Sequence, residues 1–258
     1  MSRVSFMEDF FGRGGRLNAH LFDSSMCAAK VAAIYNSYCN KWFDPCGVEI
    51  TQDPSSGARI EVMSKDNSDF PGAGLLRLLA YGKSDRDCDD DGTNEGALPS
   101  AVLTFPEMLA RKNPVVGARV LQRQDEAYNL DLLKQQIIMG FTKVGQWGTV
   151  ADDMIGFRLQ NDSATQGTWK ALYKEGGTVH ADVDTGIKQD YLVPVDLVVT
   201  MNRDEVVYQL NDRIVHVESR IVTGNKLHFE ILIGIYSRTT SDIYRELLVD
   251  AAWGSLER

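Results

Sequence analysis

Short runs of alternating apolar and polar residues dominate the second half of the chain. Gly, Asn or Asp stands between neighbouring runs. The runs lie at 137–144, 154–159, 168–173, 195–202, 206–210, 213–217, 228–236 and 245–251. Several short strands at such regular spacing predict an antiparallel β-sandwich or barrel.

The first half of the chain predicts further strands and one helix. We expect strands at 58–64, 75–81, 101–105 and 115–123. A helix is expected at 24–42, where Val31, Ile34, Tyr35, Tyr38 and Trp42 form an apolar stripe at helical spacing. Pro45 and Gly47 end it. The pattern favours packing of this stripe against the sandwich, and a contact with another subunit is the alternative.

Local features specify how the strands connect. Asn211-Asp212 has the composition of a two-residue hairpin turn. The run at 228–236 carries apolar residues on both faces, which is typical of a strand in the middle of a sheet. Gly156 is expected to allow close approach of a neighbouring strand. Asp184-Thr185-Gly186 is expected to form a tight turn.

Composition narrows the class of protein. The chain has 258 residues, of which 43% are apolar, and this is enough to bury a large core. Its net charge of −9 argues against nucleic-acid binding. We expect no membrane span, because no apolar run is long enough, and no export by a signal peptide. Cys27, Cys39, Cys46 and Cys88 are expected to be reduced thiols, with one disulfide as the alternative.

The strand and turn pattern resembles the concanavalin A-like (lectin/glucanase) jelly roll, and in particular the versions found in structural proteins of tailed-phage virions. The residues that carry the resemblance are Met139-Gly140-Phe141-Thr142, Asp153 to Leu159, Trp169-Lys170-Ala171, Asp184-Thr185-Gly186, the runs at 197–202 and 206–211, and Leu247-Leu248-Val249-Asp250. Glu8-Asp9-Phe10-Phe11-Gly12 also fits. The resemblance covers most of residues 48–254 and implies an all-β antiparallel jelly-roll sandwich, to which we assign residues 48–258. The helical insertion at 24–42, within an N-terminal segment at 1–47, and the acidic loop at 82–96 depart from the resemblance.

Catalytic signatures of that fold are not found in the sequence. The paired carboxylates of its glucanases, in an E-x-D-x-x-E type spacing, do not occur, and Gln136-Ile137-Ile138 lacks the histidine of the lyase motif. His180, Asp182 and Asp184 alternate onto one strand face, as a general base with an orienting carboxylate would, but a solvent-facing strand edge is favoured. His20, His180, His216 and His228 lack metal-ligand spacing. We therefore predict no catalytic, cofactor or metal site, and a protein that is not an enzyme.

Two other groups of residues suggest ligands. Asp87-Cys88-Asp89-Asp90-Asp91-Gly92 begins like a calcium loop, but Leu98 stands where a bidentate Glu is needed, so a solvated acidic loop is favoured. Trp147, Trp169, Tyr173 and Tyr191 could stack against sugar rings, although such residues usually fill a core or its rim.

The functional expectation follows the resemblance. We expect a virion structural protein of a tailed phage, such as a capsid decoration protein or head fibre, assembled in the host cytoplasm. Its partners would be capsid or other virion proteins and copies of itself, with residues 1–47 as the contact surface. The alternatives are a carbohydrate-binding lectin domain of a phage tail or surface protein, and a glycan lyase or hydrolase.

Overall fold

The computed structural model describes twelve stretches of the chain: residues 3–9, 41–43, 49–52, 59–62, 76–82, 100–123, 135–143, 152–161, 167–190, 193–220, 226–235 and 243–257. Within these stretches the regular structure is almost entirely β-strand, with one short 3-10 turn, η1 (Ala110–Lys112). No helix in this part of the chain is long and apolar enough to cross a membrane.

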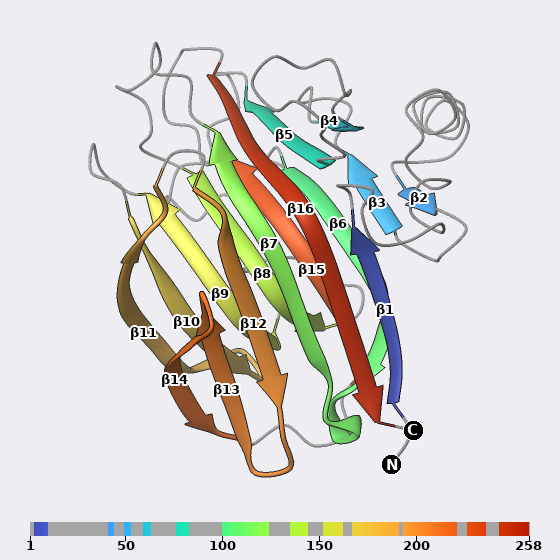
Figure 1. Cartoon of the computed structure of the whole chain (residues 1–258), viewed down its shortest axis with the longest axis vertical. Helices are drawn as coiled ribbons and strands as arrows, with labels where there is room; N and C mark the ends of the chain where they lie inside the picture. Colours follow the sequence, from blue (N-terminus) through green and yellow to red (C-terminus); the bar gives the residue numbers. More distant parts are fainter. Residues whose placement is uncertain are drawn as a thin grey trace.

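The strands form two antiparallel sheets that lie face to face (Figure 1). Sheet A has the order β14-β13-β12-β7-β16-β5-β4, and β1 also pairs with β16. Its strands are β1 (Arg3–Asp9), β4 (Arg59–Val62), β5 (Leu76–Gly82), β7 (Val115–Arg123), β12 (Val195–Met201), β13 (Glu205–Leu210), β14 (Arg213–Ser219) and β16 (Ile243–Glu257).

Sheet B has the order β11-β10-β9-β8-β15-β6-β3-β2. Its strands are β2 (Lys41–Phe43), β3 (Glu49–Gln52), β6 (Ser100–Leu109), β8 (Gln135–Lys143), β9 (Met154–Asn161), β10 (Thr168–Glu175), β11 (Thr178–Lys188) and β15 (Lys226–Ile235). The edge strands β11 and β14 lie on the same side of the sandwich (Figure 1).

The core lies between the sheets and follows from the two-residue period of a strand. In β12, Val195, Leu197, Val199 and Met201 are buried, and the residues between them are half-buried on the outer face of sheet A. One buried polar contact joins the two layers, because the hydroxyl of Tyr208 in β13 donates to the carbonyl oxygen of Leu172 in β10 at 2.9 Å. The ring of Tyr208 also meets Phe157 edge to face, with centroids 5.6 Å apart.

The predicted all-β antiparallel sandwich is confirmed, and each predicted strand coincides with an observed one. Asn211 and Asp212 have φ angles of 48° and 62° and form the expected hairpin turn. Gly156 does lie where β8 and β9 approach closely: a Cβ there would be 2.3 Å from the carbonyl oxygen of Met139.

The turn predicted at Asp184-Thr185-Gly186 is wrong. These residues lie inside β11, at a bulge where the pairing with β10 shifts register between Thr168 and Lys170. The local chemistry is the expected one, since Gly186 has φ +71° and donates its N–H to the Asp184 carboxylate at 2.8 Å. The chain does not reverse there because β10 continues alongside and supplies partners beyond the bulge.

The predicted N-terminal helix at 24–42 lies outside the described residues, except for Lys41 and Trp42, which belong to β2. The first described segment, Arg3–Asp9, is a strand of sheet A paired with β16. The division of the chain at residue 47 and the assembly role of residues 1–47 stay predictions.

Candidate functional site

A tryptophan covers a glycine on the outer face of sheet A. Trp253 in β16 is paired with Gly117 in β7. A Cβ atom on Gly117 would lie 2.4 Å from Cε2 and Cζ2 of the indole, so the ring occupies the space that a side chain at 117 would fill. Trp253 is half-buried, and its remaining surface meets solvent on this face. An aromatic ring supported by backbone in this way offers a firm apolar surface to a ligand.

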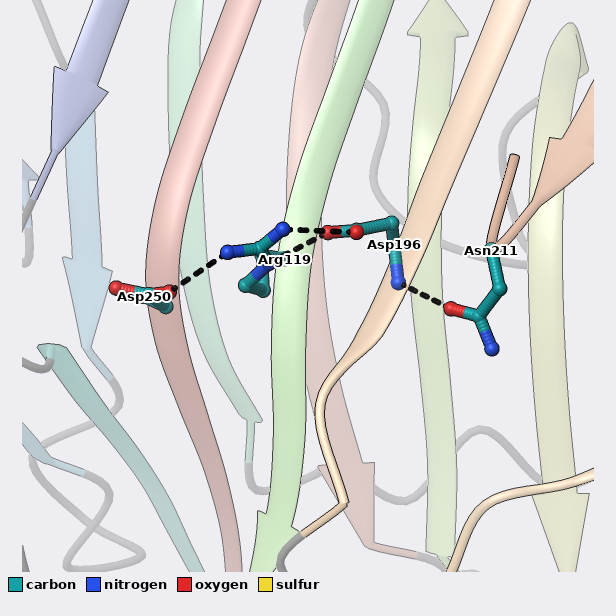
Figure 2. Close-up of polar contacts among 4 residues, drawn as sticks. All are labelled: Arg119, Asp196, Asn211 and Asp250. Atoms are coloured by element: carbon teal, nitrogen blue, oxygen red, sulfur yellow. Dashed lines mark hydrogen bonds and ion pairs between the residues drawn. The ribbon is translucent and has the colours of Figure 1, made fainter.

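A cluster of charged side chains lies two residues further along β7. Arg119 donates to both carboxylate oxygens of Asp196 in β12, from Nε at 2.7 Å and from Nη2 at 2.9 Å. Its Nη1 is 3.7 Å from Asp250 in β16. Figure 2 shows Arg119 between the two carboxylates, so that the cluster crosses three neighbouring strands.

The hairpin after β13 completes the cluster. The Asp196 N–H donates to Oδ1 of Asn211 at 2.9 Å (Figure 2), and the Asn211 N–H donates back to the carbonyl oxygen of Asp196 at 2.9 Å. This use of Oδ1 leaves the Nδ2 group of the exposed Asn211 directed away from the Asp196 backbone, as a donor at the rim. We call Gly117, Arg119, Asp196, Asn211, Asp250 and Trp253 the Trp253 surface.

Strand geometry explains why these side chains share one face. Arg119 and Gly117 are two residues apart in β7, so their side-chain directions agree, and they lie about 7 Å apart along the strand. In β16 the pairing with β7 shifts register between Val249 and Ala251. Val249 is in the core, and the shift turns Asp250 to the outer side, toward Arg119.

The charges of the surface reinforce the geometry. The hydrogen bond to Asp196 raises the pKa of Arg119, partial burial opposes this shift, and Asp196, Asp250 and Asp212 add favourable charge interactions. The guanidinium of Arg119 therefore stays protonated. More carboxylates than cations surround it. Arg119 is 47% exposed, so water or a ligand can reach the cluster.

The structure does not bring His180, Asp182 and Asp184 together as a general base with an orienting carboxylate. All three are exposed on β11, and each has a different partner. Asp182 accepts from Nη2 of Arg158 at 2.7 Å. Hydrogen bonds from the Thr168 side chain and then from the Gly186 N–H lower the pKa of Asp184. The His180 ring lies 5.5 Å from that of Tyr173.

The predicted stacking residues divide between the core and the undescribed part of the chain. Trp169 and Tyr173 are fully buried, and Nε1 of Trp169 donates to Oε1 of Gln189 at 3.2 Å inside the protein. Trp147, Tyr191, the acidic segment from Asp87 to Gly92, and the four cysteines lie outside the described residues. Among the described residues no cluster of His, Cys, Asp and Glu could hold a metal ion.

Sequence reasoning missed the members of the Trp253 surface. Gly117, Asp196 and Trp253 come from three strands that are distant in the sequence, and no motif links them. The register of β7 with β12 and β16 places them side by side. Only strand pairing, which depends on the whole sandwich, could have revealed this surface.

Comparison with known proteins gives a fold but no close relative. No protein-family model matches the chain, and no curated protein matches it. Among solved structures, a β-1,3-1,4-glucanase (lichenase) derived from a mouse hindgut metagenome has a TM-score of 0.53 and 10% identity, covering 98% of this chain and 99% of its own. A second glycosidic hydrolase has a TM-score of 0.54 and 9% identity, with 97% and 95% covered. The Emp47p carbohydrate recognition domain has a TM-score of 0.51 and 10% identity, with 84% and 91% covered.

The chain has the concanavalin A-like jelly-roll fold. The likeness extends over nearly the whole of both hydrolases and thus confirms the expected fold. It also corrects one expectation. The prediction that the chain is not an enzyme is wrong, because structures that match it along its length are glycoside hydrolases. At about 10% identity the likeness carries no residue of their sites over to this chain.

Proposed function

We propose that this protein binds a carbohydrate on the Trp253 surface. The observation that carries the proposal is the position of the Trp253 indole, which lies over Gly117 beside the Arg119–Asp196–Asp250 cluster. Sugar recognition commonly needs an apolar ring that contacts the C–H face of a pyranose, together with polar groups that bond its hydroxyls. Trp253 supplies the ring in this arrangement.

The polar groups suit vicinal hydroxyls. A sugar hydroxyl is both a donor and an acceptor, and the carboxylates of Asp196 and Asp250 accept while Arg119 and the amide of Asn211 donate. The bond between Arg119 and Asp196 holds both side chains in place before a ligand arrives. Such preorganisation reduces the entropy lost on binding. The occurrence of this fold in a carbohydrate recognition domain and in glucanases supports the same class of ligand.

The proposal is tested with the intact chain on a glycan array, followed by titration calorimetry with the best ligand. Trp253→Ala is expected to weaken binding by about tenfold, since an aromatic contact contributes about 0.5–1.5 kcal/mol beyond the apolar area that it buries. Arg119→Ala should weaken binding as well, because it releases Asp196 and Asp250 from their partner. A separate reducing-end assay with the best ligand tests for hydrolysis, since glycoside hydrolases share the fold.

Arg158→Ala is the matched control. It removes a comparable ion pair, Arg158–Asp182, from the other sheet and should leave glycan affinity unchanged. Thermal unfolding of every variant verifies that it is folded. Binding that survives both Trp253→Ala and Arg119→Ala would contradict the proposed site, and the absence of any glycan ligand would contradict the function.

A second candidate is the virion structural role that the sequence resemblance implies. The exposed apolar residues Ile214 and Val217 on β14 favour it, because a protein that assembles with its own copies needs apolar surface outside its core. Under this proposal the chain occupies regular positions on a tailed-phage particle. Imaging of intact particles tests it, and failure to find the chain on any particle would refute it.

A further inference from the structure

The outer edge of sheet A carries an unusual pair of exposed apolar residues. Ile214 is 62% exposed and Val217 is 46% exposed, and both belong to β14. β14 is the last strand of its sheet, and within the described part of the chain no strand pairs with its outer edge. An edge strand with free backbone groups and apolar side chains is a template for pairing with another strand.

A bulge in β14 explains why these two residues lie on the same face although they are three positions apart. The pairing with β13 shifts register so that Gln209 faces Ile214 while Tyr208 faces His216. Ile214 and Val217 therefore lie beside Gln209 and Val207, the half-buried outer-face residues of β13. Arg213 and Glu218 pair with Leu210 and Val206, which are buried on the core side.

We propose that β14 pairs with β14 of a second copy of this chain, antiparallel and around a two-fold axis. In one register Arg213 faces the partner's Glu218, Ile214 faces the partner's Val217, and each pair occurs twice. The two members of each of these pairs then lie on the same side of the joined sheet: Ile214 and Val217 on the outer side, Arg213 and Glu218 on the core side. Among the registers that pair most of the strand, only this one keeps the faces matched.

The contacts of this register are self-complementary. It places opposite charges across the axis twice and covers both exposed apolar residues. Arg213 is exposed, and among the described residues it makes no ion pair. Glu218 accepts from the Ser219 N–H and lies 3.3 Å from His216, so its carboxylate is held at the edge. A contact of one strand pair is small, and we expect a dissociation constant on the order of micromolar or weaker.

Sedimentation equilibrium of the intact chain, between about 1 μM and 1 mM, tests the proposal. A monomer–dimer equilibrium is expected. Arg213→Glu and Glu218→Arg should each weaken the dimer by about tenfold or more, because each places like charges opposite one another twice. The double variant R213E/E218R restores the opposite charges in this register alone, so its dissociation constant should return to within about threefold of the original.

Val179→Lys is the matched control, because Val179 is 55% exposed on β11, the edge strand of the other sheet. It should leave the dimer unchanged. A chain that is monomeric over the whole concentration range would overturn the proposal. If Arg213→Glu left the dimer unchanged, the proposed contact surface would be wrong. If R213E/E218R failed to restore the dimer, the proposed register would be wrong.

Discussion

Replacement of Gly156 by alanine should destabilise the sandwich strongly, because two glycines face each other across β8 and β9. A Cβ on Gly156 would lie 2.3 Å from the carbonyl oxygen of Met139 and 2.8 Å from Cα of Gly140. Ordinary contacts of a Cβ atom begin near 3.4 Å. The obstructing atoms are backbone, so no side-chain rotation relieves the clash, and the strands must separate by about 1 Å.

The magnitude follows from the ladder hydrogen bonds. A separation of about 1 Å takes an N···O distance from roughly 2.9 Å to 3.9 Å, beyond the range of a hydrogen bond. Two such bonds flank the site, and each contributes about 1 kcal/mol net. The adjacent core residues Ile155 and Phe157, both fully buried, would move with the strand. We therefore expect Gly156→Ala to lower the free energy of unfolding by about 2–4 kcal/mol.

Urea denaturation followed by far-ultraviolet circular dichroism measures this loss. Gly176→Asn is the control: Gly176 has φ +54° and nothing within 4 Å of an added Cβ, and Asn tolerates this conformation. We expect the control to lower stability by about 1 kcal/mol at most, because Asn adopts this left-handed conformation with less strain than other residues. If Gly156→Ala lost as little as the control, close approach of β8 and β9 would not be the reason for glycine at this position.

Three further predictions concern contacts outside the two proposed surfaces. Tyr208→Phe removes the buried hydrogen bond to Leu172 and should cost about 1–2 kcal/mol in urea denaturation. Asp153→Ala removes the acceptor of the Gly176 N–H, so amide exchange at Gly176 should become faster. Burial, and then Asp153, raise the pKa of Glu175, so its ionised form opposes folding. Glu175→Gln should therefore gain a few tenths of a kcal/mol at neutral pH. That gain should vanish below the ordinary pKa of Glu, where the carboxyl is protonated in both states; a gain that persisted there would contradict the electrostatic cause.

The strands that sequence reasoning found and missed differ in local composition. β12 and β15 are rich in Val, Leu and Ile, and their alternation was clear in the sequence. β11, Thr178–Lys188, was predicted only in part: the sequence favours a solvent-facing strand edge for His180, Asp182 and Asp184, but the glycine at its bulge predicts a turn that ends the strand. An edge strand buries little side-chain surface, so the period-two signal is weak there.

The candidate site was harder to predict than the fold. The sequence offers Trp169 and Tyr173 as aromatic residues in strands that could stack against sugar rings, but both fill the core. No sequence pattern marks Trp253 as a ligand-binding residue, because its role depends on having Gly117 as its neighbour in another strand. Which aromatic residue faces outward depends on register, and a shift of one residue reverses it.

The sequence by itself determined the all-β class, the positions of most strands and the Asn211-Asp212 turn. These features depend on alternation and on residues that adopt positive φ, which act over a few neighbouring positions. The tertiary structure alone decided that Arg119 lies between Asp196 and Asp250, that Trp253 covers Gly117, and that Ile214 and Val217 share the open edge of sheet A. The physical reason is that strand order and register arise from burial of the whole core, so they bring together residues that no local pattern connects.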